Sequence, residues 1–181
     1  MSIEQRAAVV REARSWIGTP YHNCADVKGH GVDCGMLLVR VFCDLKLCPQ
    51  FDPRPYPPDW HLHRSEERYL GFVFDRAQEV AAPLFSIARS PGDAESAAAQ
   101  AAKSGERAGA VGDRAMAVKP GDVAVFKFGR CYSHGGIVVE TDPLAIVHAY
   151  APSRCVVEDR LAQCAALASR APRFFSYWAT R

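Results

Sequence analysis

The chain has 181 residues, of which 49% are hydrophobic and 23% are charged, and its formal net charge is +2. This balance is typical of one globular domain with an apolar core, and it excludes strongly basic nucleic-acid binders and highly charged disordered chains. The N-terminus mixes acids and arginines, and no segment approaches the roughly 20 apolar residues that span a bilayer, so we expect cytoplasmic synthesis without a signal peptide or membrane span.

The first part of the chain predicts helices joined by irregular loops. Apolar residues at helical spacing predict an amphipathic helix over residues 3–17, which Gly18 and Pro20 end. After a polar loop, the apolar run 34–45 predicts a largely buried helix with Asp33 as its N-cap. The proline-rich residues 49–58 predict an extended connection, and a helix of mixed charge is expected over residues 60–74.

The second part predicts an insertion and then a sheet. Residues 88–117 are rich in Ala, Ser, Gly and charge and contain no aromatic residue, which predicts a flexible insertion. Short β-rich runs follow at 122–128, 136–141, 144–150 and 155–158, and the ending FFSYW predicts a final strand. Closely spaced strands favour an antiparallel meander, so we expect a single α+β domain over residues 1–181 with about five strands.

Cys34 is the most distinctive of seven irregularly spaced cysteines. Their odd number does not fit a disulfide framework, and we interpret most of them as reduced residues of the core. Cys34 differs because it lies at the predicted start of a buried helix, where free backbone N–H groups and the helix dipole favour a thiolate. This position predicts a nucleophile.

Two histidines could complete a site with Cys34. His134 lies at the entry to one predicted strand and His148 lies within the next. If the two strands form a hairpin around Asp142 and Pro143, the two imidazoles come close together on neighbouring strands. Because a buried imidazole needs a polar partner, each histidine explains the other, with His134 as the base and His148 as the group that orients it.

The segments GTPYHNCADVKGHGVDCGMLLV, PGDVAVF, SHGGIVV and IVHAY together resemble the NlpC family of cell-wall cysteine peptidases, and within it the phage and prophage tail branch. The resemblance implies a papain-like fold with Cys34 as nucleophile, His134 as base and His148 as the orienting residue. It also implies that Tyr21 helps to stabilise the oxyanion and that Asp33 meets the free amine of the stem peptide. The family commonly has Asp-Cys-Ser-Gly where this chain has Asp-Cys-Gly-Met, which leaves its fine specificity open.

The function implied by this resemblance is the cleavage of amide bonds in peptidoglycan stem peptides, of the γ-D-glutamyl-diaminopimelate type, without a cofactor. An imidazolium at His134 and the helix N-terminus are expected to hold Cys34 as a thiolate that forms a thioester with the substrate. The expected partners are the stem peptide and, in a phage or prophage tail, other tail proteins; such a tail would bring the protein to the cell wall. No nucleic-acid partner is expected.

Several alternatives stay open. One is a zinc site in the pattern H-x-C-x5-H-x3-C, formed by His22, Cys24, His30 and Cys34, although its spacing is not that of a finger or ribbon; a second metal site could use His61 and His63 with Glu66 or Glu67. Another is a tail component that keeps the fold but only binds wall peptide. A third keeps the chemistry and passes the thioester to an amine. The scattered arginines, Arg170 and Arg173 among them, are interpreted as solvated surface.

Overall fold

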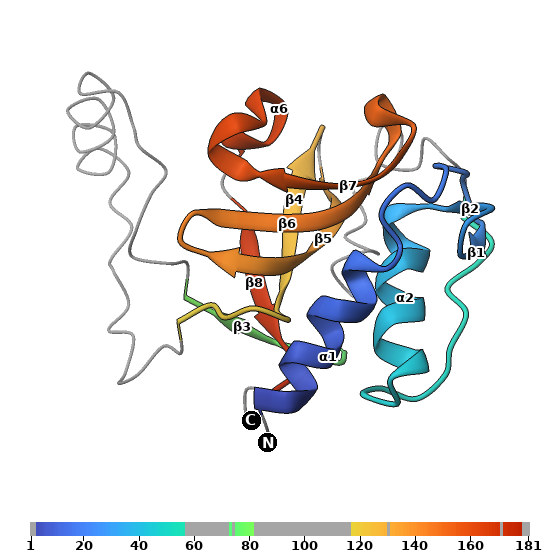
Figure 1. The fold of residues 1–181 in the computed structure, drawn as a ribbon, viewed down its shortest axis with the longest axis horizontal. Helices are drawn as coiled ribbons and strands as arrows, with labels where there is room; N and C mark the ends of the chain where they lie inside the picture. The colour runs from blue at the N-terminus through green and yellow to red at the C-terminus, as the bar shows by residue number, and fades with distance from the viewer. Residues whose placement is uncertain are drawn as a thin grey trace.

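The computed structural model describes residues 3–56, 73, 75–81, 117–129, 131–170 and 172–178. In these residues two helices pack on a six-stranded antiparallel sheet, which confirms the expected α+β fold class (Figure 1). The expected insertion at 88–117 and the expected helix at 60–74 lie almost entirely outside the described residues. No helix of the described part is both long enough and apolar enough to cross a membrane.

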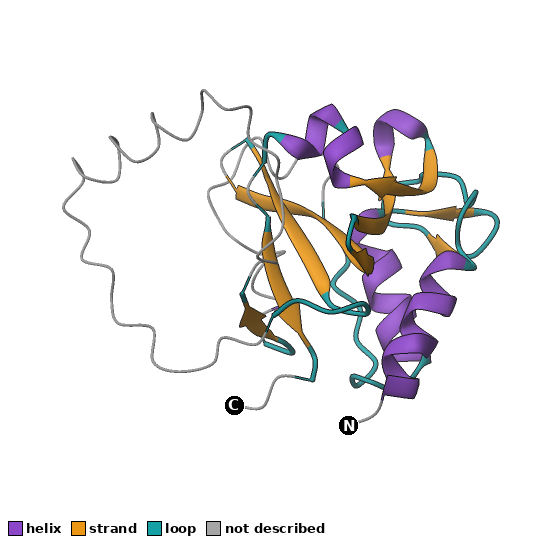
Figure 2. Ribbon diagram, turned by 60° about the vertical axis from the view of Figure 1, so that its left-hand side comes forward, coloured by secondary structure: helices purple, strands orange, loops and turns teal. Residues whose placement is uncertain are grey.

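The two longer helices lie side by side against the sheet (Figures 1 and 2). Helix α1 (Ile3–Arg14) is shorter than predicted, because the residues after Arg14 form a turn that leaves Ile17 47% exposed. Helix α2 (Cys34–Asp44) begins where the sequence predicts. Its N-cap is Asp33, whose carboxylate accepts a hydrogen bond of 2.8 Å from the N–H of Met36.

A small hairpin precedes α2 where the sequence predicted only a loop. It consists of β1 (Asp26–Val27) and β2 (Gly31–Val32), and it ends directly before Asp33. Two isolated bridges hold the preceding segment beside it, because Tyr21 pairs with Val32 and Pro20 pairs with Cys155. These bridges tie the loop that carries Tyr21 to the start of α2 and to the sheet.

The six-stranded sheet has the order β3-β8-β4-β5-β6-β7. The four runs predicted to be strands are β4 (Val123–Phe128), β5 (Cys131–Thr141), β6 (Leu144–Tyr150) and β7 (Cys155–Arg160), and they form the expected meander. The aromatic ending forms β8 (Arg173–Ser176), which pairs with β4 on one side and on the other with β3 (Gln78–Val80), a strand that the sequence did not predict. Three short helical elements complete the described residues: η1 (Ala151–Ser153), η2 (Leu161–Gln163) and α6 (Ala165–Ala168).

The sheet is covered on both faces, which explains why its strands read as continuous apolar runs. In β4, Val123 and Val125 belong to the core formed with α1 and α2. Their neighbours Ala124 and Phe126 point to the opposite face and pack in a second core with residues such as Leu167 of α6. Alternate side chains of the sequence VAVF therefore pack into the two cores on opposite faces of the sheet.

A buried ion pair fixes α1 to the sheet. Nη1 of Arg6 lies 2.8 Å from Oδ1 of Asp122, and Nη2 donates a hydrogen bond of 3.0 Å to Oγ of Ser176 at the end of β8. The guanidinium also lies 4.2 Å from the ring centroid of Trp178. The Asp122 side chain is fully buried, so Arg6 is its essential counter-charge.

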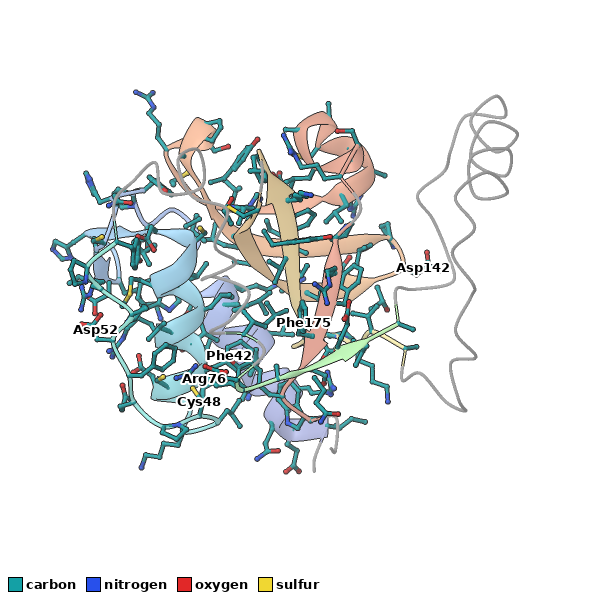
Figure 3. The ribbon with its side chains drawn as sticks, turned by 180° about the vertical axis from the view of Figure 1, so that it is seen from behind. Phe42, Cys48, Asp52, Arg76, Asp142 and Phe175 are labelled. Carbon is teal, nitrogen blue, oxygen red and sulfur yellow. The ribbon has the colours of Figure 1, made fainter. Side chains whose placement is uncertain are left out.

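Two thiols lie close together at the C-terminal end of α2. The sulfurs of Cys43 and Cys48 lie 3.2 Å apart, close to Phe42 and Arg76 (Figure 3). All seven cysteines are described, and none of them forms a disulfide with another. Cys43 thus lies on the same helix as Cys34 but near its opposite end.

Candidate active site

Cys34, the first residue of α2, places its sulfur against strand β5. The sulfur lies 3.9 Å from the carbonyl oxygen of Ser133, and the N–H of Gly135 donates a hydrogen bond to it. These two backbone groups stand on either side of His134 in the sequence. The structure therefore brings the proposed nucleophile and the strand segment that carries the proposed base together.

The sulfur meets the β5 backbone beyond the point where the regular pairing of β5 with β6 ends. The pairing of β5 with β6 stops at Ile137 and Val147, although β5 extends back to Cys131 and β6 extends on to Tyr150. Beyond this point β6 continues to pair with β7 alone. We call the place where this pairing ends the β5–β6 seam. The backbone groups of Ser133 and Gly135 that would otherwise pair with β6 are thereby available to Cys34.

His134 and His148 are in direct contact across the seam. Nε2 of His134 lies 2.8 Å from Nδ1 of His148, and the two ring centroids are 5.0 Å apart. Both side chains are buried, with exposed fractions of 8% and 0%. The hairpin predicted from the sequence thus brings the two imidazoles together, and His134 lies inside β5 rather than at its entry.

Gly136 makes this contact possible. A Cβ atom at this position would lie 3.1 Å from Cβ of His148 and 3.0 Å from Cδ1 of Ile146. It would also lie 3.1 Å from the carbonyl oxygen of Val147, which belongs to the backbone and cannot rotate away. The second glycine of the segment SHGG is therefore required for close packing of the strand that carries His148.

A carboxylate that the sequence pattern did not indicate completes the chain of side chains. Nε2 of His148 lies 3.1 Å from Oδ2 of Asp159 on β7. The predicted strand ended at residue 158, one residue before Asp159, whereas β7 continues to Arg160. A longer strand in register with β6 would have indicated that Asp159 faces the same side of the sheet as His148.

The three side chains define which ring nitrogens carry protons. A carboxylate accepts hydrogen bonds, so Nε2–H of His148 donates to Asp159 and Nδ1 of His148 remains an acceptor. Nε2–H of His134 therefore donates to His148. This arrangement leaves Nδ1 of His134 unprotonated, which is the form required of a base.

The environment keeps the resting site neutral. Burial and the negative charge of Asp33 raise the pKa of the Cys34 thiol to about 12, against the opposing effect of backbone N–H groups at the start of α2. Burial, with contributions from His148 and then Arg170, lowers the pKa of His134 well below its ordinary value. Both shifts oppose the thiolate–imidazolium pair expected from the sequence, and they favour a thiol beside a neutral imidazole.

Tyr21, which the resemblance assigns to the oxyanion, lies on the loop whose bridge to Val32 ties it to the start of α2, and its role stays a prediction. Its backbone N–H donates to the carbonyl of Arg154 at 2.8 Å, and its neighbour Pro20 accepts from Val32, so the loop position is fixed on two sides. Burial, followed by the proximity of Cys34, raises the pKa of the Tyr21 phenol. The hydroxyl therefore stays protonated and can act as a hydrogen-bond donor.

Asp33 is occupied by three donors of the protein itself. Its carboxylate accepts hydrogen bonds from the backbone N–H groups of Met36 at 2.8 Å and Cys24 at 2.6 Å, and from the hydroxyl of Tyr56 at 2.8 Å. The residue is only 2% exposed. These contacts give Asp33 a role in building the helix start, while the expected contact with a substrate amine stays a prediction. Tyr56 was not singled out from the sequence, where it lies among prolines.

The residues of the zinc alternative do not form a metal site. Among the described residues, no three His, Cys, Asp or Glu side chains gather in a way that could hold a metal ion. Cys24 contacts the Tyr56 carbonyl at 3.3 Å, and Nδ1 of His30 lies 3.2 Å from the carbonyl oxygen of Lys28. His61 and His63, the second metal alternative, lie outside the described residues.

Comparisons with known proteins identify the fold. No protein-family model matches the chain, and a search of curated proteins finds no significant match. An N-acetylmuramoyl-L-alanine amidase from Bacteroides uniformis is similar in structure with a TM-score of 0.55 and 17% identity, over 95% of this chain and 98% of that one. The NlpC/p60 domain of the peptidoglycan hydrolase SagA gives a TM-score of 0.50 and 15% identity, over 93% and 96% of the two chains. A putative xylanase from Bacteroides fragilis gives 0.50 and 17%, over 92% and 99%. At these identities the likeness shows a shared fold, that of the NlpC/p60 domain.

Proposed function

We propose that this protein is a cysteine hydrolase that cleaves an amide bond in peptidoglycan stem peptides. The observation that carries the proposal is the position of the Cys34 sulfur against the backbone on both sides of His134, whose ring is linked through His148 to Asp159. A nucleophile, a base and a group that orients the base are the parts that covalent amide hydrolysis requires. The fold neighbours described as a peptidoglycan hydrolase and as an amidase support the choice of substrate class.

The first step begins from the neutral pair. Nδ1 of His134 accepts the proton of the Cys34 thiol as the sulfur attacks the carbonyl carbon of the scissile amide. A C–S bond forms, and one electron pair of the C=O bond moves onto oxygen. The backbone N–H of Cys34 and the hydroxyl of Tyr21 are the proposed donors to this oxyanion. Proton transfer during attack avoids a separate buried ion pair, which the local pKa shifts disfavour.

The second half returns the proton and releases the acid. The imidazolium of His134 protonates the leaving nitrogen as the C–N bond breaks, which leaves a thioester on Cys34. Water then attacks the thioester, His134 accepts one of its protons, and the sulfur leaves as a thiol once the proton returns to it. The products are an amine and a carboxylic acid. An amine that replaces water at this stage would give acyl transfer instead.

The bond within the stem peptide and the site of action are the finer parts of the proposal. The choice of the γ-D-glutamyl-diaminopimelate bond rests on the resemblance of the segments around Cys34, His134 and His148 to the NlpC family. A place in a phage or prophage tail, reached after cytoplasmic synthesis, rests on the resemblance to the tail-associated branch of that family.

The test is incubation of the purified protein with synthetic stem tri- and tetrapeptides, followed by mass spectrometry of the products. Wild type is expected to release the amine and acid fragments, whereas Cys34→Ala is expected to lose activity by about 1,000-fold or more. Cys43→Ala, at the other end of the same helix, is the matched control and should retain activity. Cleavage that survives in Cys34→Ala excludes the mechanism, and stoichiometric binding without cleavage by wild type indicates a wall-binding module.

A further inference from the structure

Arg170, just beyond α6, holds its guanidinium in one place at the edge of the proposed active site. Its Nε donates a hydrogen bond of 2.8 Å to the carbonyl of Ala166, and its Nη1 donates one of 2.5 Å to the carbonyl of Lys127. The guanidinium carbon lies 3.8 Å from the ring centroid of Phe128. Three contacts thus fix a side chain that the sequence analysis interpreted as free in solvent.

The Phe128 ring, which Arg170 contacts, also contacts the proposed base His134. Phe128 meets His134 edge-on, with their ring centroids 5.4 Å apart. The charge of Arg170 reaches the imidazole, since it contributes to lowering the pKa of His134 after burial and His148. None of the carboxylates in the described ranges lies within ion-pair distance of Arg170. Its second terminal nitrogen, Nη2, has no hydrogen-bond partner there either.

Tyr150 places a second polar group on the same side of His134. Its ring centroid lies 5.8 Å from that of His134 and 5.0 Å from that of His148. The residue is partly exposed, and its hydroxyl has no hydrogen-bond partner among the described residues. Burial raises the pKa of the Tyr150 phenol, Cys164 and Asp159 add to the rise, and Arg170 opposes it. Tyr150 lies against the His134 ring, and Arg170 lies against Phe128, which meets the same ring, so both side chains flank one imidazole. We call Arg170 and Tyr150 together the cationic rim.

The charged side chains near Cys34 differ from those near the two histidines, where the cation Arg170 is present together with the carboxylate of Asp159, which is bonded to His148. The group that acts electrostatically on the Cys34 sulfur is Asp33, whereas the cation that acts on the His134 imidazole is Arg170. In amide hydrolysis the acyl part of the substrate is attached to the nucleophile, and the leaving nitrogen takes its proton from the base. A side chain beside the base rather than beside the sulfur therefore faces the leaving part of the substrate.

We propose that the cationic rim binds a carboxylate carried by the leaving-amine part of the substrate, with the fixed guanidinium of Arg170 donating through Nη2 and Tyr150 donating through its hydroxyl. This inference rests on the proposed function and deepens it. Diaminopimelate and lysine stem peptides offer a matched pair of leaving groups, because diaminopimelate is lysine with an added carboxylate at the end of its side chain. The rim selects the diaminopimelate peptide.

The experiment compares kcat/KM for the two stem tetrapeptides, in which the α-carboxyl group of the third residue is blocked by the amide to D-alanine. Wild type is expected to prefer the diaminopimelate peptide by about 10- to 100-fold, the size of the effect of one charge-assisted contact. Arg170→Gln should abolish that preference by slowing only the diaminopimelate peptide, and Tyr150→Phe should reduce it several-fold. Arg173→Gln, which removes an arginine already paired with Glu79 at 2.6 Å, is the control and should keep the preference.

Binding measurements separate failure of the rim from failure of the proposed function. Both peptides are titrated into Cys34→Ala and into Cys34→Ala/Arg170→Gln, with thermal unfolding as the check that each variant is folded. If wild type cleaves both peptides with equal kcat/KM, the proposed role of the rim is wrong and the proposed hydrolase function stands. A slowing of both peptides alike in Arg170→Gln also overturns the role of the rim, since that is the result of displacing Phe128 alone. If the protein cleaves neither peptide but binds the diaminopimelate peptide selectively and through Arg170, the proposed role of the rim stands and the proposed hydrolase function is wrong. If the protein neither binds nor cleaves the peptides, both proposals are wrong.

Discussion

Nε2 of His148 lies 3.1 Å from Oδ2 of Asp159, so the ring that contacts His134 is itself held by a carboxylate. Asp159 is partly exposed, whereas His148 is fully buried. The negative charge of Asp159 therefore lies at the solvent end of a line of side chains that leads inward through His148 to His134. Asp159 acts through the two histidines, as a positioning residue.

Asp159→Ala is expected to lower kcat by about 10-fold with little change in KM, because His148 loses the partner that fixes its tautomer. Because Asp159 is partly exposed, water can enter the space that its carboxylate leaves and replace part of the contact with His148, which keeps the effect moderate. The tautomer itself can be followed through the ¹⁵N NMR shifts of the ring nitrogens of His134. Glu158→Ala, which removes the neighbouring carboxylate bonded to Arg14, is the control. Equal kcat values for Asp159→Ala and the control would contradict the positioning role.

The folded protein should lose stability on both sides of neutral pH. Burial lowers the pKa of His134 and of His148 below 6.5, so the unfolded chain takes up protons that the folded chain does not as the pH falls below about 6.5. On the alkaline side, burial and Asp33 raise the pKa of Cys34 from 9.0 to about 12. The unfolded chain releases this proton above pH 9, and stability falls as the pH rises toward 12.

Urea denaturation at a series of pH values measures both effects. Stability should be greatest between about pH 7 and 9. Cys34→Ala should show a shallower alkaline loss than wild type, because its unfolded chain has one fewer thiol to ionise. A Cys34→Ala curve that runs parallel to the wild-type curve above pH 9 would show that the thiol is not shielded as described.

Gly136→Ala is expected to destabilise the protein by about 1–3 kcal/mol, because the added methyl group overpacks the seam beside His148. Activity should fall further than stability, since a shift of β6 moves His148 away from His134. The double variant Gly136→Ala/Ile146→Val removes the contact with Cδ1 of Ile146 but not that with His148. It should regain part of the unfolding free energy and little of the activity; full recovery of activity would show that Ile146 alone limits the space.

Arg6→Met is expected to lower the free energy of unfolding by about 3 kcal/mol, because it leaves the carboxylate of Asp122 buried without its counter-charge. The urea midpoint measures this loss. Activity per folded molecule should stay unchanged, since the ion pair joins α1 to β4 and β8 rather than to Cys34 or His134. Arg11→Met, an exposed position on the same helix, should leave the midpoint within about 0.5 kcal/mol of wild type. If Arg6→Met and Arg11→Met had similar urea midpoints, the proposed role of Arg6 in anchoring α1 to the sheet would be wrong.

The parts of the site that the sequence predicts are those specified by local patterns. The helix start at Cys34 follows from an N-cap aspartate before an apolar run, and the meeting of His134 with His148 follows from a hairpin between two β-rich runs. Both patterns act over a few residues or across one turn. For that reason each is visible before any tertiary contact is known.

The parts that the sequence does not predict depend on contacts between distant segments. Asp159 reaches His148 only through the register of β7 on β6, and Tyr56 reaches Asp33 from 23 residues away in the sequence. The position of β8 between β3 and β4 likewise depends on contacts between distant segments. Local propensity contains no information about which strand edge an aromatic ending will occupy.

The protonation states of Cys34 and His134 could not be predicted from the composition either. A cysteine at a helix start favours a thiolate on local grounds, yet burial and the charge of Asp33 act in the opposite direction and outweigh the helix N–H groups. The arginines illustrate the same point, because Arg170 appears in the sequence as one solvated charge among many. Its place beside Phe128 is visible only in the fold.

The residues proposed for catalysis are all carried by regular elements: Cys34 by α2, His134 by β5, His148 by β6 and Asp159 by β7. Their mutual geometry is determined by the register of β5, β6 and β7 and by the packing of α2 on β5. Relatives that keep this register and packing could therefore replace many surface side chains over evolutionary time without moving a reacting atom.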